Sequence, residues 1–337
     1  MNEQEVKTRA RERMKGYCRV CPKCDGKACA GEVPGMGGVL TGTAFVNNIE
    51  ALAMYNLNMR TIHQVDDPDT SLKVFGRKFA TPIFAAPLCG TARNMGGVLQ
   101  ETELASYLVN GAKAAGSCAF TGDGPENEIF AAGLEAITAA DGMGIVIIKP
   151  LSMEAIKEHL RLAEKSGAMA VGIDIDGAGF SSMASAGNPV SPKTFYQLRE
   201  LIKNTTLPFI IKGIMTKQEA EMAVEAGAAA IVISNHGGRV LDCTPGVAEV
   251  LPEIVERVKG EIFVFADGGV RSGVDVLKMM ALGADGVLVG RPLLHGAFGA
   301  GSKGVKIILE KITSEFKHAM LMTGCVNVKA IDYKVIY

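Results

Sequence analysis

The feature that most constrains the fold is the regular alternation of short apolar runs and amphipathic stretches between residues 83 and 289. The runs are rich in β-branched and other apolar residues, which predicts strands buried on both faces. They are Ile83–Ala86, Ser117–Phe120, Ile145–Ile148, Ala170–Ile175, Phe209–Ile211, Ala230–Ile233, Ile262–Ala266 and Gly286–Val289. Between them lie stretches of helical period, among them Met153–Ser166, Pro192–Lys203, Lys217–Ala226, Val247–Lys259 and Gly273–Leu282. Helical stretches ending in Ala-Gly-Ala or Leu-Gly-Ala carry the glycine signal of a helix C-terminus.

Eight strand–helix units in this order predict a TIM (β/α)8 barrel over residues 81–337, of the usual size of about 250 residues. Residues 1–80 then form a cysteine-rich N-terminal extension. We expect in it a charged, solvated helix over Glu3–Lys15, a helix over Asn48–Asn58, and a hairpin over Ser71–Phe79 with Gly76-Arg77 at the turn. An open doubly wound sheet is the alternative, but no GxGxxG motif opens the first unit.

Composition excludes several classes of function. The formal net charge of the 337 residues is −1, and aromatic residues make up 6% with no Trp. Neither a bulk electrostatic partner, such as nucleic acid or a membrane surface, nor a base-stacking platform is therefore expected. No secretory h-region and no apolar run of about 18 residues is present, which predicts a cytoplasmic protein without a membrane span. In that compartment the 8 cysteines are expected as thiols or metal ligands.

Four of these cysteines, Cys18, Cys21, Cys24 and Cys29, lie within a dozen residues at the spacing CxxCxxCxxxxC. Thiolates at such spacing, with Pro and Gly to turn the backbone, suit a tetrahedral Zn²⁺ or an iron–sulfur cluster. The alternatives are a thiol redox pair and a cysteine-rich loop that binds nothing. The spacing does not choose zinc from iron–sulfur.

Polar residues stand where the predicted strands end, which in a barrel is where chemistry is performed. His236, which can exchange protons near neutral pH, follows a strand, and Arg239 can hold a carboxylate in a two-pronged hydrogen bond. After the seventh and eighth strands come Asp267-Gly268-Gly269-Val270-Arg271 and Gly290-Arg291, which suit a phosphate. Lys212 ends a strand in apolar surroundings and needs an anionic partner. A Schiff-base lysine is an alternative, but a flavin ring is the better partner, because a cation beside its N1/O2 edge stabilises the negative charge that reduction places there.

Several of these motifs together resemble one family. Leu207-Pro208-Phe209-Ile210-Ile211-Lys212-Gly213, SNHGGRVLD at 234–242, ADGGVRSGVDVLKMMALGADGVLVGRP at 266–292 and Met322-Thr323-Gly324-Cys325 resemble the FMN-dependent α-hydroxy-acid oxidases and dehydrogenases (the glycolate oxidase and lactate oxidase family). The likeness is densest from Thr206 to Cys325. It implies a TIM barrel that binds FMN and a homo-oligomer, a tetramer or larger.

The resemblance also implies roles for individual residues. His236 would take a proton from the substrate hydroxyl or its α-carbon while a hydride equivalent reaches flavin N5, and Arg239 would hold the substrate carboxylate. Asp176 would pair with the histidine, although Asp174 is a competing assignment. Lys212 would lie at flavin N1/O2. The remaining FMN-binding positions would be Pro87, Leu88, Thr121, Lys149, Ser234, Asp267, Gly268, Gly269, Arg271, Gly290 and Arg291, together with His236.

The chain departs from the family pattern on the substrate side. The N-terminal tyrosine of the family falls near the cysteine cluster, and Leu151 stands where another tyrosine is usual. Lys149 replaces a glutamine at the flavin pyrimidine edge, and Asp123 replaces a bulky aromatic residue. A second carboxylate-binding arginine is missing, since Gly177 to Asn188 contains no Arg or Lys. Asp123 either points to solvent or favours a substrate with a cationic or hydroxyl group.

These observations predict an FMN-dependent oxidoreductase that converts a 2-hydroxy acid to a 2-oxo acid, and the departures on the substrate side argue against a small substrate such as lactate or glycolate. One alternative is an FMN barrel with non-redox chemistry like that of type 2 isopentenyl diphosphate isomerases. Another is a flavin- or metal-binding sensor in which the cysteines carry the signal.

Overall fold

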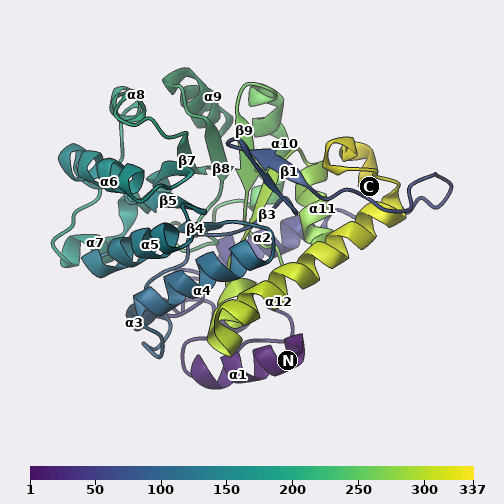
Figure 1. The fold of residues 1–337 in the computed structure, drawn as a ribbon, viewed down its shortest axis with the longest axis horizontal. Coiled ribbons are helices and arrows are strands. Elements are labelled where there is room, and N and C mark those ends of the chain that lie inside the picture. Colours follow the sequence, from purple (N-terminus) through teal and green to yellow (C-terminus); the bar gives the residue numbers. More distant parts are fainter.

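The eight apolar runs form a closed parallel barrel in a computed structural model that describes residues 1–337, apart from the side chain of Ser181. The strands follow one another around the barrel in chain order, and β10 closes onto β3 (Figure 1). They are β3 Ile83–Ala85, β4 Ala119–Thr121, β5 Gly144–Ile148, β6 Ala170–Asp174, β7 Phe209–Ile214, β8 Ala230–Ile233, β9 Phe263–Ala266 and β10 Gly286–Val289. The predicted TIM barrel is therefore confirmed.

Helices surround the strands, as the helical stretches predict (Figure 1). They are α4 Glu101–Ala114, α5 Asn127–Ala139, α6 Met153–Lys165, α8 Phe195–Lys203, α9 Lys217–Ala226, α10 Val247–Val258, α11 Gly273–Ala281 and α12 Arg291–Thr323, with the short α3 Thr91–Asn94 and α7 Ser181–Ser185 at the cavity end. α12 is kinked where Ala300 and Gly301 leave helical geometry. Within the barrel, predicted and observed bounds differ by up to three residues, because the ends of elements depend on contacts with neighbours that are distant in sequence.

Two apolar layers hold the barrel together. Inside it, Phe84, Phe120 and Phe265 are fully buried and meet edge to face, with ring centroids 5.4 Å apart for Phe120 and Phe265. Outside it, buried Leu, Ile, Val and Ala side chains of the helices pack on the strands. Because the interior is filled by aromatic rings, the polar residues of the barrel are confined to the carboxyl ends of the strands.

A hairpin packs against the filled interior of the barrel. Its strands, β1 Leu72–Val74 and β2 Arg77–Phe79, pair antiparallel, and the Phe79 ring lies 5.3 Å from that of Phe84. The hairpin was expected, but its turn is Phe75-Gly76, with φ of 47° and 77°, and Arg77 already belongs to β2. Two successive left-handed residues make a tight turn whose twist matches that of the strands.

The N-terminal extension packs on the barrel. The first helix, α1 Glu3–Arg13, is charged and exposed on most of its surface, as expected, but it also lies against α12, where Val6, Ala10 and Met14 are fully buried (Figure 1). The second, α2 Thr43–Ala53, begins five residues before the predicted start of Asn48 and packs on α10 and α11. Sparse apolar positions in a charged stretch are enough to anchor a helix when a partner helix is close.

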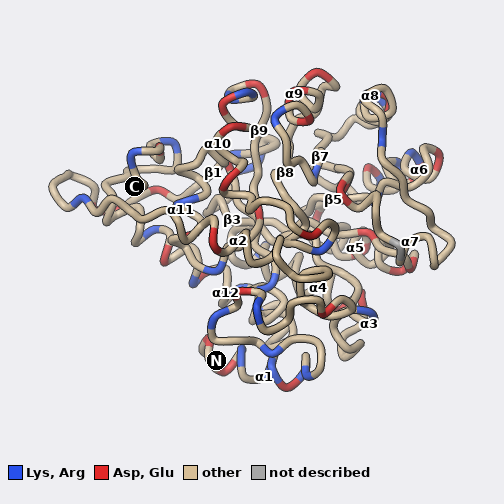
Figure 2. Tube along the Cα trace, turned by 180° about the vertical axis from the view of Figure 1, so that it is seen from behind, with Lys and Arg blue, Asp and Glu red and all other residues tan. Residues whose placement is uncertain are grey.

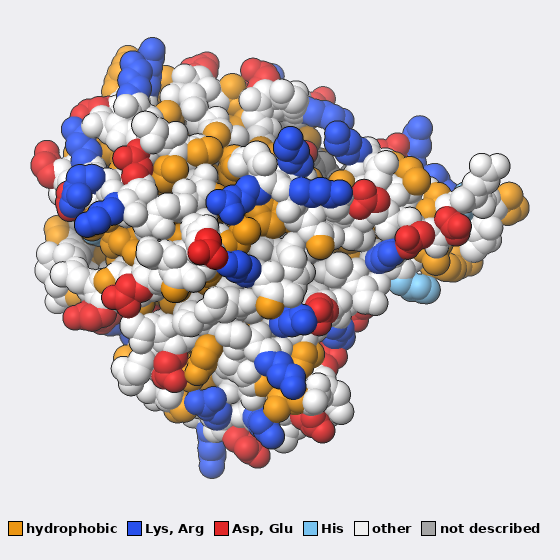
Figure 3. Space-filling model, in the orientation of Figure 1, with side chains coloured by type: hydrophobic (Ala, Val, Ile, Leu, Met, Phe, Trp, Pro, Cys, Tyr) orange, Lys and Arg blue, Asp and Glu red, His pale blue; other side chains and the backbone are white. Residues whose placement is uncertain are grey.

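The surface carries charges of both signs. Lys and Arg alternate with Asp and Glu along the chain and on the face drawn in Figure 3, in keeping with the near-neutral net charge (Figures 2 and 3). Among the described residues, no helix is both long enough and apolar enough to cross a membrane.

Candidate active site

A cavity of about 510 Å³ opens at the carboxyl ends of the strands and collects most of the predicted site residues. Its walls include Pro87, Leu88, Lys149, Lys212, His236, Arg239, Asp267, Gly268, Gly269, Arg271, Gly290 and Arg291. Thr121, Ser234, Asp176 and the four N-terminal cysteines do not line it. The hydroxyl of Thr121 instead points to the carbonyl of Ile145, at 3.5 Å, so a direct flavin contact from Thr121 is not evident.

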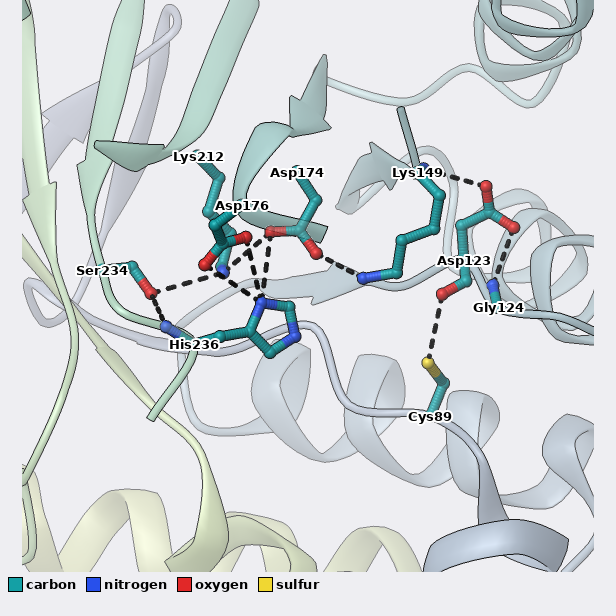
Figure 4. Close-up of polar contacts among 9 residues, drawn as sticks. All are labelled: Cys89, Asp123, Gly124, Lys149, Asp174, Asp176, Lys212, Ser234 and His236. Carbon is teal, nitrogen blue, oxygen red and sulfur yellow. Dashed lines mark hydrogen bonds and ion pairs between the residues drawn. The ribbon is translucent and has the colours of Figure 1, made fainter. Parts of the chain in front are cut away.

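His236 is held in place from three sides. Its backbone is left-handed, with φ of 58°, and its N–H donates to the Ser234 hydroxyl at 3.0 Å. Its Nδ1 lies 3.1 Å from Asp176 Oδ1 and 3.6 Å from Asp174 Oδ1 (Figure 4). The Phe180 ring meets the imidazole edge to face at 5.1 Å. With Nδ1 on a carboxylate, Nε2 on the opposite side of the ring is the nitrogen able to exchange a proton.

Asp174 is the centre of a buried ion cluster (Figure 4). Its carboxylate contacts the ammonium of Lys149 and lies 3.0 Å from that of Lys212, which also donates to Ser234 at 3.3 Å. Burial alone would raise the pKa of Asp174, but the facing charges of His236, Lys149 and Lys212 hold it well below its ordinary value. Burial opposes the charge of each lysine as well, yet Asp174 keeps both lysine pKa values raised.

The register of the barrel explains this cluster. In the parallel pair of β6 and β7, Asp174 stands beside Lys212. The ladder between β7 and β8 then shifts at Gly213, whose φ is 101°. A Cβ at that position would stand 2.6 Å from the Cβ of Asp176, so only glycine lets the second carboxylate reach His236. Both aspartates therefore lie beside His236, and Asp176 makes the shorter contact to the histidine.

Arg239 contacts the N-terminal extension. Its Nη1 donates to the carbonyls of Gly35 and Gly37 at 2.7 and 3.0 Å, and its Nη2 donates to Asn94 Oδ1 at 3.0 Å. Burial lowers the pKa of Arg239. Its guanidinium lines the cavity in this position and presents donors suited to a carboxylate.

The region predicted to hold phosphate contains two more half-buried guanidinium groups. Arg291 donates to the carbonyl of Met36 at 2.9 Å and stacks on Phe45 at 3.7 Å. Arg271 donates to the carbonyl of Cys24 at 3.2 Å, and within the described chain its buried Nη2 has no hydrogen-bond partner. Burial, together with repulsion from Arg271 and Arg239, lowers the pKa of Arg291 to about 9. Such a concentration of buried positive charge calls for an anion.

Close packing as well as backbone conformation requires glycine at two positions of this region. Gly268 and Gly269 have φ of 86° and 84°, and a Cβ on either would stand 2.6 Å or less from atoms of Asn48 in α2. Asn48 in turn donates to Asn235 Oδ1 at 2.8 Å, next to the catalytic histidine candidate. The extension thus packs directly against the residues that line the cavity.

Asp123 is buried, so the interpretation that it points to solvent was wrong. Its carboxylate accepts from the backbone N–H groups of Gly124 and Lys149 at 2.8 and 2.9 Å (Figure 4). It also lies 3.6 Å from His159. It braces two loops instead of pointing to solvent, and it also lines the cavity, so a contact with a cationic or hydroxyl group of the substrate stays a prediction. Sequence reasoning also missed Cys89, Asn94 and Phe180, which line the cavity. Their short loops carry no motif that could have pointed to them.

The four N-terminal cysteines are half-buried free thiols. Burial raises the pKa of Cys18 to about 11, and the charges of Cys24, Cys29 and Cys21 raise it further. Cys18 Sγ lies 3.6 Å from Nε2 of the buried His295. Among the described residues, the one group of three or more potential ligand atoms within 4.8 Å of each other is Asp174, Asp176 and His236. No three of the four thiols therefore form a ligand group among the described residues.

Comparison with known proteins is decisive for the family. The model of the FMN-dependent dehydrogenase family matches residues 36–186 and 179–337. This chain belongs to the FMN-dependent dehydrogenase family. Human 2-hydroxyacid oxidase 1 is 31% identical over 331 residues, spanning 86% of this chain and 87% of that protein. The L-lactate oxidase of Lactobacillus jensenii is 30% identical over 328 residues, spanning 85% of this chain and 76% of that protein.

Solved structures agree with this family assignment. A crystal structure of mandelate oxidase superposes with a TM-score of 0.82 at 29% identity, covering 100% of this chain and 97% of that one. The residues present here fit FMN: the cavity is large, Arg271 has an orphaned buried donor, and Lys212 supplies a buried cation. As a member of this family, the chain is an FMN-dependent oxidoreductase.

Proposed function

We propose that this oxidoreductase converts a 2-hydroxy acid to the corresponding 2-oxo acid. The observation that carries the proposal is the pairing of His236 with Asp176 at 3.1 Å beside a cavity that Arg239 also lines. A base and a carboxylate receptor in one cavity are what a 2-hydroxy acid requires. The names of the relatives, hydroxyacid oxidase and lactate oxidase, support this class of substrate.

Different residues would bind the substrate, accept its proton and hold FMN. Arg239 orients the substrate through its carboxylate, and Nε2 of His236 takes one proton from the substrate hydroxyl or from its α-carbon. Asp176 favours the protonated imidazole that results, since an adjacent carboxylate stabilises a positive charge. Bound FMN supplies the two-electron acceptor that the oxidation needs. Lys212 and Lys149 would present cations to its ring, and Arg271, Arg291 and the Gly290 loop would hold its phosphate.

The alternatives predict different chemistry. A non-redox isomerase would leave the flavin oxidised or would need it reduced beforehand, and a sensor would not turn over. The buried ion cluster around His236 favours the oxidoreductase. Two carboxylates beside the imidazole stabilise the positive charge that it gains when it takes a proton from the substrate.

The test is anaerobic mixing of the flavin-loaded protein with lactate, glycolate and mandelate, followed by flavin absorbance. We expect bleaching with at least one of them. A His236→Ala variant should keep FMN and lose bleaching by about 10²–10⁴-fold, the usual contribution of a general base. His318→Ala, which changes an exposed histidine, is the matched control and should bleach normally. Unimpaired bleaching by His236→Ala would remove this histidine from the mechanism.

The remaining predictions of cofactor, assembly and location are also proposals. We propose zinc or an iron–sulfur cluster at Cys18, Cys21, Cys24 and Cys29, supported by their CxxCxxCxxxxC spacing. We propose a homo-oligomer, which light scattering tests. A cytoplasmic location is supported by the eight free thiols and is tested by fractionation.

A further inference from the structure

A hydrogen-bond donor beside Arg239 has no acceptor within the part of the chain that the structure describes. Asn94 lines the cavity, and its Oδ1 accepts from Arg239 Nη2 at 3.0 Å. A guanidinium can only donate, so the amide oxygen must face Arg239 and Nδ2 of the same amide must face away from it. Gly90, next to which Nδ2 lies, also lines the cavity. The free donor of Asn94 is therefore at the cavity wall.

Asn94 is held in this position by an anchored turn. It is the last residue of α3, and its N–H donates to the carbonyl of Gly90 at 2.9 Å. Glu101 begins α4 and fixes the other end of α3, because its carboxylate accepts from the N–H of Gly90 at 3.2 Å and from the hydroxyl of Thr91 at 2.9 Å. A Cβ on Gly90 would stand 3.0 Å from Asn94 Nδ2, so glycine at this position leaves the amide room.

Arg239 alone offers too few donors for a carboxylate. Its Nη1 donates to the carbonyls of Gly35 and Gly37, and one N–H of Nη2 goes to Asn94. Of the five donors of a guanidinium, these bonds to described residues leave Nε–H and one N–H of Nη2. A carboxylate has about four lone-pair sites, and a buried one must find protein donors for the hydrogen bonds that it gives up in water. A further donor beside Arg239 is therefore needed.

The other cations at the cavity already have partners. Lys149 and Lys212 both contact the carboxylate of Asp174. The exposed Arg93 pairs with Glu126 at 3.2 Å. The arginines that follow β9 and β10 lie in the region predicted to hold phosphate. The amide at the end of α3 is then the donor that can complete a carboxylate site with the guanidinium that follows β8.

We infer that Asn94 binds the substrate carboxylate together with Arg239 and thereby selects acids over their amides. Nδ2 of Asn94 donates to one carboxylate oxygen, while its Oδ1 orients the guanidinium that donates to the other. The inference rests on the proposed function, since that function places a 2-hydroxy acid in this cavity. A primary amide in place of the carboxylate has one accepting oxygen, but its NH2 group only donates. It would therefore meet a donor where it needs an acceptor.

The experiment compares the wild type with Asn94→Asp, Asn94→Ala and Asn204→Asp, each loaded with FMN. Aspartate keeps the size of the side chain and the acceptor for Arg239, but it replaces the Nδ2 donor by a second, negatively charged acceptor. Alanine removes the amide without adding charge. Asn204 is the matched control, because it is exposed and stands at the C-cap of α8, before β7 and thus at the other end of the barrel.

Binding is measured by the change in flavin absorbance on titration with pyruvate, glyoxylate and benzoylformate, which do not reduce the flavin, and with the primary amide of each. Reduction by lactate, glycolate and mandelate is measured without air. For Asn94→Asp we expect oxo-acid Kd values weaker by about tenfold or more, because a donor to a charged oxygen becomes a like charge. The preference for acid over amide should fall by about tenfold or more, and the reduction rate at saturating acid should change by less than about threefold.

Asn94→Ala should weaken binding of the oxo acids without improving that of the amides, and Asn204→Asp should behave as the wild type. Equal weakening of acids and amides by Asn94→Asp overturns the inference, as does unchanged binding in both Asn94 variants. Loss of FMN from both variants overturns it as well, because Asn94 would then support the fold of the cavity. If the wild type binds FMN but no oxo acid binds and no hydroxy acid reduces it, the proposed function itself is contradicted, and the inference falls with it.

Discussion

The two aspartates beside His236 should respond differently to substitution by Asn. Asp174→Asn should lower mainly the stability, and Asp176→Asn should lower mainly the rate. Asp174 holds two lysines in a site where its side chain is 3% exposed, with Lys212 at 3.0 Å. At an effective dielectric constant of about 20, one such pair contributes roughly 5 kcal/mol of gross attraction. Removing one partner of a buried ion pair costs about 3–5 kcal/mol, because the other charge is left uncompensated. Asp174→Asn should lower the free energy of unfolding by that amount.

Asp176→Asn should act on the rate instead. Its one charged partner within 4 Å is His236, whereas Asp174 faces two lysines, so we expect Asp176→Asn to cost less stability than Asp174→Asn. A charge-assisted hydrogen bond contributes about 1.5–3 kcal/mol, which corresponds to roughly 10- to 150-fold in kcat/KM.

Urea unfolding and anaerobic flavin reduction, measured on both variants with matched FMN content, provide the assay. Full stability of Asp174→Asn would refute the ion cluster as an electrostatic unit. If Asp174→Asn is stable but slow while Asp176→Asn is fast, Asp174 is the partner of the histidine and the assignment is reversed.

Two further predictions follow from the same structure. Gly76 and Gly238 have φ of 77° and 78°, but a Cβ at Gly76 meets nothing within 4 Å, whereas at Gly238 it would stand 2.4 Å from Phe45 N. Gly76→Ala should therefore cost about 1–2 kcal/mol and Gly238→Ala about 2–5 kcal/mol with loss of FMN, measured by urea unfolding and flavin content; equal costs would contradict the close approach of α2. The pKa of Asp174 is held below its ordinary value, so its contribution is complete above about pH 4 and is lost as pH falls through the folded-state pKa. The difference in unfolding free energy between wild type and Asp174→Asn should accordingly shrink below about pH 4, and a difference that grows there would show the opposite sign.

The sequence by itself determined the barrel and the position of its active end. Apolar runs of strand length separated by helical periods admit few other folds, and residues at the ends of parallel strands must share one edge. For that reason His236, Arg239, Lys212, Arg271 and Arg291 could be placed around one cavity before any contact was known.

Only the tertiary structure decided which charges meet. Whether Asp174 or Asp176 faces His236 depends on the β6–β7 register and on the irregularity at Gly213, which one-dimensional spacing does not contain. Asp123 links two loops because its carboxylate accepts hydrogen bonds from the backbone N–H groups of Gly124 and Lys149. The cysteine-rich N-terminal extension reaches Arg239 across about two hundred residues of chain. Local pattern specifies an element and its buried face, whereas contacts between distant segments are set by how the finished elements pack.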